Sequence, residues 1–240
     1  LDFYLGKSVW KTGHKLYLFI SLFINLSILG FFKYANFFIE SFIDFSRLLG
    51  YDPSRTTLDI ILPLGISFYT FQSMSYTIDM YRKKYKPYNS ILDFALYVSF
   101  FPQLIAGPIV RANYFLKQIN RKINLSFKLV NTGVSIFIIG CFKKIVIADQ
   151  AAVFSNEIFS SPSEYTFLLS SVGILAFSFQ IYFDFSGYTD MARGLGYLLG
   201  YKLPENFLHP YGSLGIREFW RRWHLSLSSW LKDYLYISLG

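Results

Sequence analysis

Long runs without a charged residue limit what this chain can fold into more than any other feature of its sequence. Four of them are 17 to 19 residues long and cover residues 16–32, 60–78, 94–110 and 165–183. A helix rises about 1.5 Å per residue, so each run is near the length that crosses a hydrocarbon core roughly 30 Å thick. A fifth run, 129–142, is interrupted by two lysines and resumes at 145–148. The pattern predicts an all-α, polytopic integral membrane protein with four or five spans.

The composition agrees with a membrane environment. Hydrophobic residues make up 53% of the 240 residues, and charged residues only 16%, against about a quarter in soluble domains. The net charge is +8, and the basic residues lie between the apolar runs rather than along one soluble face. This distribution is better explained by the positive-inside rule for membrane proteins than by binding to nucleic acid. The single cysteine, Cys141, excludes an intrachain disulfide and is expected to be an inert buried thiol.

We treat residues 1–240 as a single integral membrane domain, because no repeat, low-complexity tract or soluble linker divides them. The chain begins with Leu1 and stops directly after an apolar, helix-like stretch. We therefore expect an internal fragment of a longer chain.

The run 94–110 is expected not to cross the membrane. Basic clusters at 82–86 and 111–128 flank it on both sides, so a simple crossing would put one cluster on the wrong face. Two prolines and a glycine at its centre would also break a helix at the depth where unpaired backbone is most costly. We predict a re-entrant element that enters from the cytoplasmic side, and a similar helix break at residues 62–65.

The pattern changes after residue 183. Four glycines, at 187, 194, 196 and 200, punctuate a moderately apolar stretch, and a polar turn that contains Asn206 follows at 203–207. This predicts interfacial structure that leads into a site.

Residues 218–236 are predicted to form one amphipathic helix. At about 100° per residue, most of its apolar residues share the side of Trp220, and His224 lies about 40° from Trp220 within that apolar arc. A basic, tryptophan-rich helix is a normal occupant of the membrane interface, and this alone accounts for the residues Arg221, Arg222 and Trp223. His224 is either a structurally satisfied histidine or a functional one, because an unpaired imidazole there costs about 1 to 3 kcal/mol.

A second polar group follows the apolar run 165–183. Gln180 and Asp184 are four residues apart and share a helix face, with Asp190 further on. A carboxylate in this position either faces a polar cavity or pairs with a cation such as Arg221 or Arg222. Phosphate loops, nucleophile elbows and metal-ligand histidine pairs are absent from the sequence, so no metal is expected.

Five strings in this sequence resemble the bacterial membrane-bound O-acyltransferases. They occur in the order typical of that family, from about residue 58 to the end. They read Leu-Pro-Leu-Gly-Ile-Ser-Phe-Tyr-Thr-Phe-Gln (62–72), Phe-Phe-Pro-Gln-Leu-Ile-Ala-Gly-Pro-Ile (100–109), Phe-Lys-Lys-Ile-Val-Ile-Ala-Asp (142–149), Tyr-Phe-Asp-Phe-Ser-Gly-Tyr-Thr-Asp-Met-Ala (182–192) and Glu-Phe-Trp-Arg-Arg-Trp-His-Leu-Ser-Leu-Ser-Ser-Trp-Leu (218–231). The alginate-acetylating branch is nearer in resemblance than the branch that D-alanylates teichoic acid.

The resemblance implies a helical membrane bundle with a tunnel or funnel, placed as a multi-pass protein in the cell membrane, which is the inner membrane in a Gram-negative cell. An acetyl group would pass from a cytoplasmic thioester, such as acetyl-CoA or an acyl carrier, towards hydroxyls of an exported polysaccharide such as alginate. The thioester is a co-substrate, so no bound cofactor is expected. The implied partners are the lipid bilayer, the donor, the polysaccharide, and periplasmic or extracellular acetylation proteins.

The resemblance also implies roles for individual residues. His224 matches the histidine of the family's Trp-His motif, and a second, catalytic histidine is expected in a later apolar helix beyond residue 240. The 240-residue piece alone is therefore expected to be inactive. His224 is the candidate catalytic-site residue, which would position substrate or support the missing histidine. A neutral imidazole near its reference pKa of about 6.5 can also assist loss of the hydroxyl proton. The candidate substrate-binding residues are Asp184, Asp190, Gln180, Arg221, Arg222, Trp223, Gln103 and Asn206.

Two other classes of function stay open at this stage. Broken apolar runs and intramembrane polar residues are equally natural in a transporter or channel subunit, although the inverted repeats that would favour transport are not found. A non-catalytic membrane scaffold is the third possibility.

Overall fold

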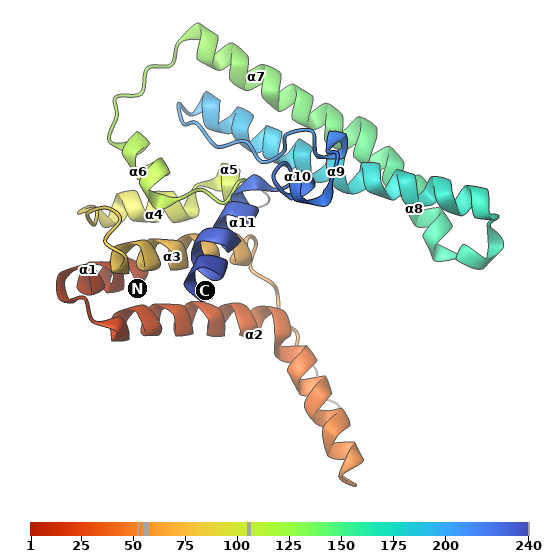
Figure 1. The fold of residues 1–240 in the computed structure, drawn as a ribbon, viewed down its shortest axis with the longest axis horizontal. Coiled ribbons are helices and arrows are strands. Elements are labelled where there is room, and N and C mark those ends of the chain that lie inside the picture. The colour runs from red at the N-terminus through yellow and green to blue at the C-terminus, as the bar shows by residue number, and fades with distance from the viewer. Residues whose placement is uncertain (52, 55–57, 105–106, 240) are drawn as a thin grey trace. The chain divides into compact units, whose positions relative to one another are not determined.

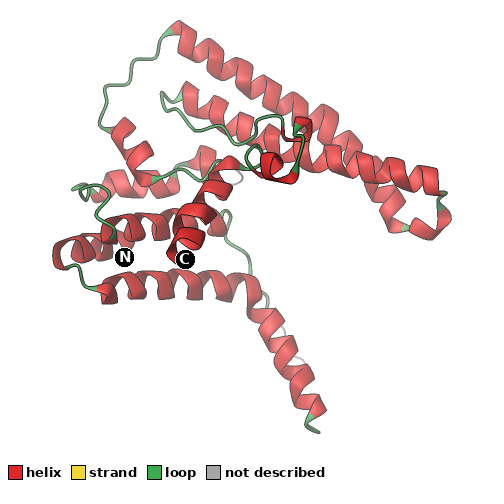
Figure 2. Ribbon diagram, in the orientation of Figure 1, coloured by secondary structure: helices red, strands yellow, loops and turns green. Residues whose placement is uncertain are grey.

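The structure, a computed structural model, describes residues 1–51, 53–54, 58–104 and 107–239 (Figure 1). Every regular element in these ranges is a helix, as Figure 2 shows, which confirms the all-α prediction. The chain divides into two compact units, one made of residues 1–99 and 111–113, the other of 100–110 and 114–240. The expectation of a single membrane domain stays a prediction.

The described residues of the first unit form four helices. They are α1 (Asp2–Thr12), α2 (Lys15–Leu48), α3 (Ile66–Tyr81) and α4 (Ile91–Ser99). A Cβ atom on Gly6 of α1 would lie only 2.5 Å from the ring of Tyr76 on α3, so the two helices pack in direct contact. The hydroxyl of Ser21 on α2 donates a hydrogen bond of 2.6 Å to Asp2, and its oxygen lies 3.0 Å from the hydroxyl oxygen of Thr77. These polar bonds tie α1, α2 and α3 together.

The helix α3 corrects one of the predicted spans. The run 60–78 was expected to cross the membrane, but the helix begins only at Ile66 and has 16 residues. Pro63 disfavours helical backbone in the residue before it, and Gly65 adopts a left-handed conformation with φ 74° at the start of the helix. The predicted break at 62–65 is therefore correct, and it shortens the helix below a spanning length.

The second unit contains the remaining elements. They are α5 (Phe101–Leu104), α6 (Ala112–Ile119), which belongs to this unit from residue 114 onward, α7 (Phe127–Cys141), η1 (Phe142–Ala148), α8 (Asp149–Ser160), η2 (Pro162–Glu164), α9 (Phe167–Leu198), η3 (Pro210–Gly212), α10 (Ile216–Trp220), α11 (Leu225–Trp230), η4 (Leu231–Tyr236) and α12 (Ile237–Leu239). The elements η1 and η4 are π-helical, and η2 and η3 are single 3-10 turns.

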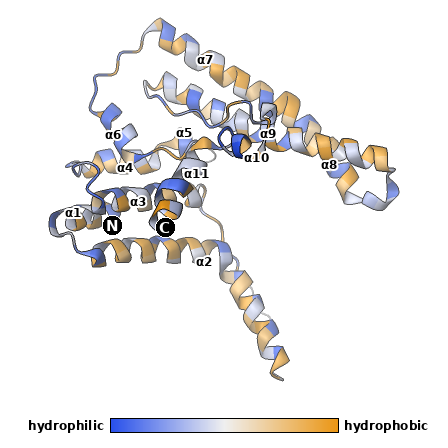
Figure 3. Cartoon of the chain, in the orientation of Figure 1, coloured by the Kyte–Doolittle hydropathy of each residue, from blue (hydrophilic) through white to orange (hydrophobic). Residues whose placement is uncertain are grey.

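Three helices in the described residues are long and apolar enough to cross a membrane. They are α2, the continuous helix Phe127–Ser160 that joins α7, η1 and α8, and α9. Their apolar character is visible in Figure 3, most clearly along α2 and α7. The chain is thus a multi-pass membrane protein, and its described residues contain three such helices where four or five spans were predicted.

The run 94–110 is broken, as predicted. The helix α4 ends at Ser99, α5 is a single turn, and residues 107–111 are not helical. A Cβ on Gly107 would collide with the backbone of Gln103, so this close return of the chain requires glycine. Residues 105 and 106 of this run lie outside the described residues.

The helix α9 does not end where the sequence pattern changed. It continues past residue 183 to Leu198, and only the last of the four glycines, Gly200, has a positive φ, at 84°. Figure 1 shows α7 and α9 side by side, and two pairs of glycines bring their backbones together. A Cβ on Gly140 would lie 2.7 Å from the carbonyl oxygen of Gly187, and a Cβ on Gly194 would lie 2.7 Å from that of Gly133. These glycines therefore serve helix packing.

Candidate functional site

The backbone around His224 corrects the predicted helix 218–236. The helix α10 ends at Trp220, and α11 begins only at Leu225. His224 adopts a left-handed backbone conformation, φ 43° and ψ 56°, which is uncommon for a residue other than glycine. The angle of 40° between His224 and Trp220, derived for a continuous helix, is therefore wrong.

The imidazole of His224 is buried among aromatic rings. Its side chain lies 4.6 Å from the ring of Phe185 and 6.3 Å from that of Phe207, measured between ring centres, and the residue is only 7% exposed. Its Nε2 atom is buried and has no hydrogen-bond partner among the described residues. Burial lowers the pKa of His224 to about 4, so the imidazole is uncharged at neutral pH. The pKa near 6.5 assumed from the sequence is therefore too high, and the imidazole is a weaker base.

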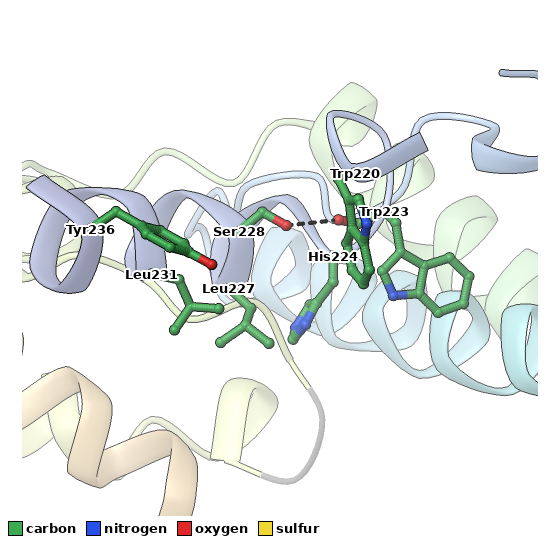
Figure 4. Close-up of a pocket in the computed structure, with 7 residues that line it drawn as sticks. All are labelled: Trp220, Trp223, His224, Leu227, Ser228, Leu231 and Tyr236. Atoms are coloured by element: carbon green, nitrogen blue, oxygen red, sulfur yellow. Dashed lines mark hydrogen bonds between the residues drawn. The ribbon is translucent and has the colours of Figure 1, made fainter. Parts of the chain in front are cut away.

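A cavity of about 550 Å³ opens beside this histidine. Figure 4 shows the imidazole on the same side of the chain as Leu227 and Leu231. The cavity is lined by Trp220, Trp223, His224, Leu227, Ser228, Leu231 and Tyr236. The hydroxyl of Ser228 is bonded to the backbone oxygen of Trp223 at 3.1 Å, and most of the lining is apolar. A residue with one unpartnered, buried nitrogen thus contributes to the lining of a mostly apolar cavity.

An aromatic cluster packs behind the histidine. Its centre is Phe207, whose ring lies 5.0 Å from that of Trp223 and 5.2 Å from that of Phe185. Tyr182, one turn before Phe185 on α9, also contacts Phe207, at 5.9 Å. Trp223 thus packs within the cluster as well as lining the cavity.

Asn206 joins the polar turn 203–207 to the start of α11. It is 1% exposed, its backbone oxygen accepts a hydrogen bond from the Leu225 N–H at 2.9 Å, and its Oδ1 accepts one from the Ser226 N–H at 3.0 Å. The Ser226 hydroxyl in turn accepts a hydrogen bond from the Ile109 N–H at 2.9 Å. The bonds bring together the end of the string 100–109, the turn and the string 218–231. Sequence reasoning missed Ser226, whose only signal was its place just after the histidine.

The two arginines of this segment differ in their surroundings. Arg222 forms an ion pair with Glu218 and donates a hydrogen bond to the backbone oxygen of His209 at 3.4 Å. Glu218 also accepts a hydrogen bond from the Leu214 N–H at 2.9 Å. Arg222 therefore holds the turn before His224, while Arg221 is exposed.

The acidic residues of α9 pair with cations other than those expected. Asp184 lies 2.5 Å from Lys144, which also binds Asp149 at 2.7 Å, so the expected pairing with Arg221 or Arg222 is wrong. Asp190 binds Lys143 at 2.6 Å and Arg193 at 3.1 Å. Both lysines lie in the π-helical η1 and pair with carboxylates of α9.

The remaining candidates lie in separate surroundings. Gln180 accepts a hydrogen bond of 2.6 Å from Ser155 of α8. Gln103 is fully buried beside Gly107 in the broken run. Among the candidates, Trp223 and Asn206 are brought to His224 by the contacts above. Substrate binding by Asp184, Asp190, Gln180, Gln103 and the arginines stays a prediction.

Comparisons with known proteins agree on one family. The sequence pattern described as MBOAT, membrane-bound O-acyltransferase family, matches residues 86–240. The chain is 46% identical over 244 residues to the probable alginate O-acetylase AlgI of Pseudomonas aeruginosa, covering 100% of this chain and 46% of that protein. It is 42% identical over 252 residues to the peptidoglycan O-acetyltransferase of Helicobacter pylori, covering 94% of this chain and 47% of that protein.

A more distant relative is the teichoic acid D-alanyltransferase of Bacillus subtilis. The identity is 32% over 190 residues, covering 77% of this chain and 47% of that protein. The chain spans about half the length of these curated relatives.

Proposed function

Because the chain belongs to the membrane-bound O-acyltransferase family, we propose that the whole protein transfers an acetyl group from a cytoplasmic thioester to hydroxyls of an exported polysaccharide. Two of the relatives described above are named for O-acetylation, one of alginate and one of peptidoglycan. The observation that carries the proposal is the buried, uncharged imidazole of His224, which has an unpartnered Nε2 and belongs to a residue that lines an apolar cavity.

The chemistry suits such a site. The acceptor hydroxyl oxygen attacks the thioester carbonyl carbon, the carbon–sulfur bond breaks, and the hydroxyl proton passes through a base to the leaving thiolate. With a pKa near 4, His224 is better suited to orienting the hydroxyl through a hydrogen bond than to holding its proton. The second histidine that the family resemblance implies would then be the base. The apolar lining excludes water, which would otherwise hydrolyse the thioester.

The donor, acceptor and location follow from the same proposal. The donor is a soluble acetyl thioester such as acetyl-CoA or an acyl carrier, and the acceptor is a polysaccharide such as alginate. The protein would lie in the inner membrane of a Gram-negative cell and act with periplasmic or extracellular acetylation proteins. Transport is not favoured, because the named relatives are all acyl-group transferases.

Replacement of His224 in the full-length protein tests the proposal. We expect His224→Ala and His224→Gln to lower acetyl transfer to the polysaccharide about 100-fold or more, the lower end of what a catalytic proton-transfer or orienting group contributes. The measurement is transfer from labelled acetyl-CoA in membranes, normalised to protein level. His209→Asn is the matched control, because His209 is an exposed histidine with the same left-handed backbone, and asparagine tolerates that conformation. Unchanged transfer by both His224 variants at equal protein level would refute the role of His224 in the transfer.

A further inference from the structure

We propose that Asn206 is a positioning residue, which holds His224 in its left-handed conformation and thereby aims the imidazole at the cavity. The inference rests on the proposed function and deepens it, since it concerns the same site. In this inference Asn206 acts on the reaction by holding His224 in place, whereas the sequence had suggested a direct contact of Asn206 with substrate.

The backbone at His224 needs an external constraint. Its φ of 43° and ψ of 56° lie in the left-handed region, which is unfavourable for residues with a side chain, although asparagine, aspartate and histidine occupy it more often than the others. The periodicity of residues 218–236 favours a continuous helix, which would turn the imidazole away from its present direction. Contacts from elsewhere must therefore interrupt the helix at this residue.

Asn206 supplies the contacts that such an interruption requires. The first N–H groups of a helix have no partner within that helix and are usually satisfied by the side chain of the residue before it. That residue is His224, and its side chain makes no such bond. Asn206 instead accepts from the Leu225 N–H with its backbone oxygen, at 2.9 Å, and from the Ser226 N–H with Oδ1, at 3.0 Å. The imidazole therefore does not cap α11, and His224 lines the cavity instead.

The same loop also holds the residues before the histidine. The Leu208 N–H donates a hydrogen bond of 2.9 Å to the backbone oxygen of Arg222. Between these two attachments, the ring of Phe207 lies parallel to the imidazole, with an angle of 11° between the planes. Residues 206–208 therefore run alongside 222–226 and fix the chain on both sides of His224.

The side-chain oxygen of Asn206 can be tested separately from its size. Asn206→Leu keeps the volume and the backbone oxygen but removes Oδ1. Asn206→Asp keeps Oδ1, and it sacrifices no bond, because Nδ2 has no hydrogen-bond partner in the part of the chain that the structure describes. The pair of variants isolates the bond to the Ser226 N–H.

The experiment measures acetyl transfer by the full-length protein in nanodiscs. We expect Asn206→Leu to lower kcat at least about tenfold with a KM for acetyl-CoA within about twofold of wild type, because a small misplacement of a positioned group is costly. Asn206→Asp should keep at least about a third of the wild-type kcat. Asn206→Ala replaces the leucine variant, with the same expectation, if the latter lowers the protein level.

Gln118 provides the matched control. Its amide forms two hydrogen bonds with the backbone of Lys202, at 3.0 and 2.8 Å, near the start of the same loop and away from α11. Gln118→Leu should leave kcat within about twofold of wild type. A loss equal to that of Asn206→Leu would mean that Asn206 only stabilises the loop, and it would overturn the inference. Wild-type kcat in Asn206→Leu, or a loss in Asn206→Asp as large as in Asn206→Leu, would overturn it as well.

A second readout separates this inference from the proposed function. Absence of transfer by the wild-type protein would refute the function alone. The ¹⁵N signals of the His224 imidazole, assigned with His224→Gln, show without any substrate whether Asn206 holds the residues around His224 in place. We expect the imidazole to titrate at about pH 4 in the wild type, and at higher pH in Asn206→Leu, where the loosened chain admits water. An unchanged titration in Asn206→Leu would overturn the inference that Asn206 holds His224 in place.

Discussion

At the level of single residues, the burial of His224 couples protonation to stability. Folding lowers its pKa from 6.5 to about 4, so between these pH values the unfolded chain binds a proton that the folded chain does not. The free energy of unfolding should therefore fall as the pH drops below 6.5, by about 2 kcal/mol at pH 5, and His224 should have no such effect above pH 6.5. Comparing the unfolding of wild type and His224→Gln at pH 7 and pH 5 measures this contribution, and a difference that does not change with pH would contradict it.

The identity of this histidine could be predicted from the sequence, but its direction could not. A helical wheel assumes continuous backbone, and the left-handed conformation of His224 depends on bonds to a residue 18 positions earlier. The sequence predicted Asn206 only as a polar candidate in a turn, since nothing local indicates which N–H groups its oxygens accept from. The partners of Asp184 were mistaken for the same reason, because Lys144 lies in η1, far from Asp184 in the sequence.

At the level of helices, the glycines between α7 and α9 should be intolerant of any side chain. A Cβ on Gly140 would lie 2.7 Å from both the Gly187 oxygen and the Met191 nitrogen, and neither backbone atom can move independently of its helix. We expect Gly140→Ala to lower the free energy of unfolding by about 1 to 3 kcal/mol, as overpacking typically does. Gly30→Ala is the control, since nothing lies within 4 Å of its Cβ position on α2, and alanine favours a helix there. Thermal unfolding in detergent measures both, and equal midpoints would contradict close packing of α7 and α9.

The apolar runs predicted the positions of these helices better than the prolines and glycines within the runs predicted where the helices end. Prolines at 63 and 102 were correctly read as breaks, because their effect on the backbone is local. The glycines at 187 and 194 were misread, since a glycine that ends a helix and one that admits a second helix look alike in a single sequence. The π-helical segment 142–148 has no periodic signal of its own and was missed.

At the level of the whole molecule, membrane residence follows from the sequence, while the number of crossings depended on where helices begin. Residues 60–78 contain enough apolar residues to span a bilayer, but six of them precede the first residue of α3. A count of apolar residues does not distinguish residues inside a helix from those before it. A membrane crossing, however, requires that the backbone groups form hydrogen bonds within the helix. The three helices that remain suggest which loops lie on opposite faces of the membrane.

Single-cysteine labelling can determine the faces on which these loops lie. In full-length protein without other cysteines, including Cys141→Ser, we expect Lys86→Cys and Lys122→Cys to be labelled from the cytoplasm, because basic loops stay inside and the run between them is broken. Ser163→Cys should be labelled from outside, because the helix Phe127–Ser160 is long enough to carry the chain across once after Lys122. All three positions are exposed, so a missing label would reflect the membrane rather than burial. Opposite accessibility of Lys86→Cys and Lys122→Cys would mean that the run 94–110 crosses after all.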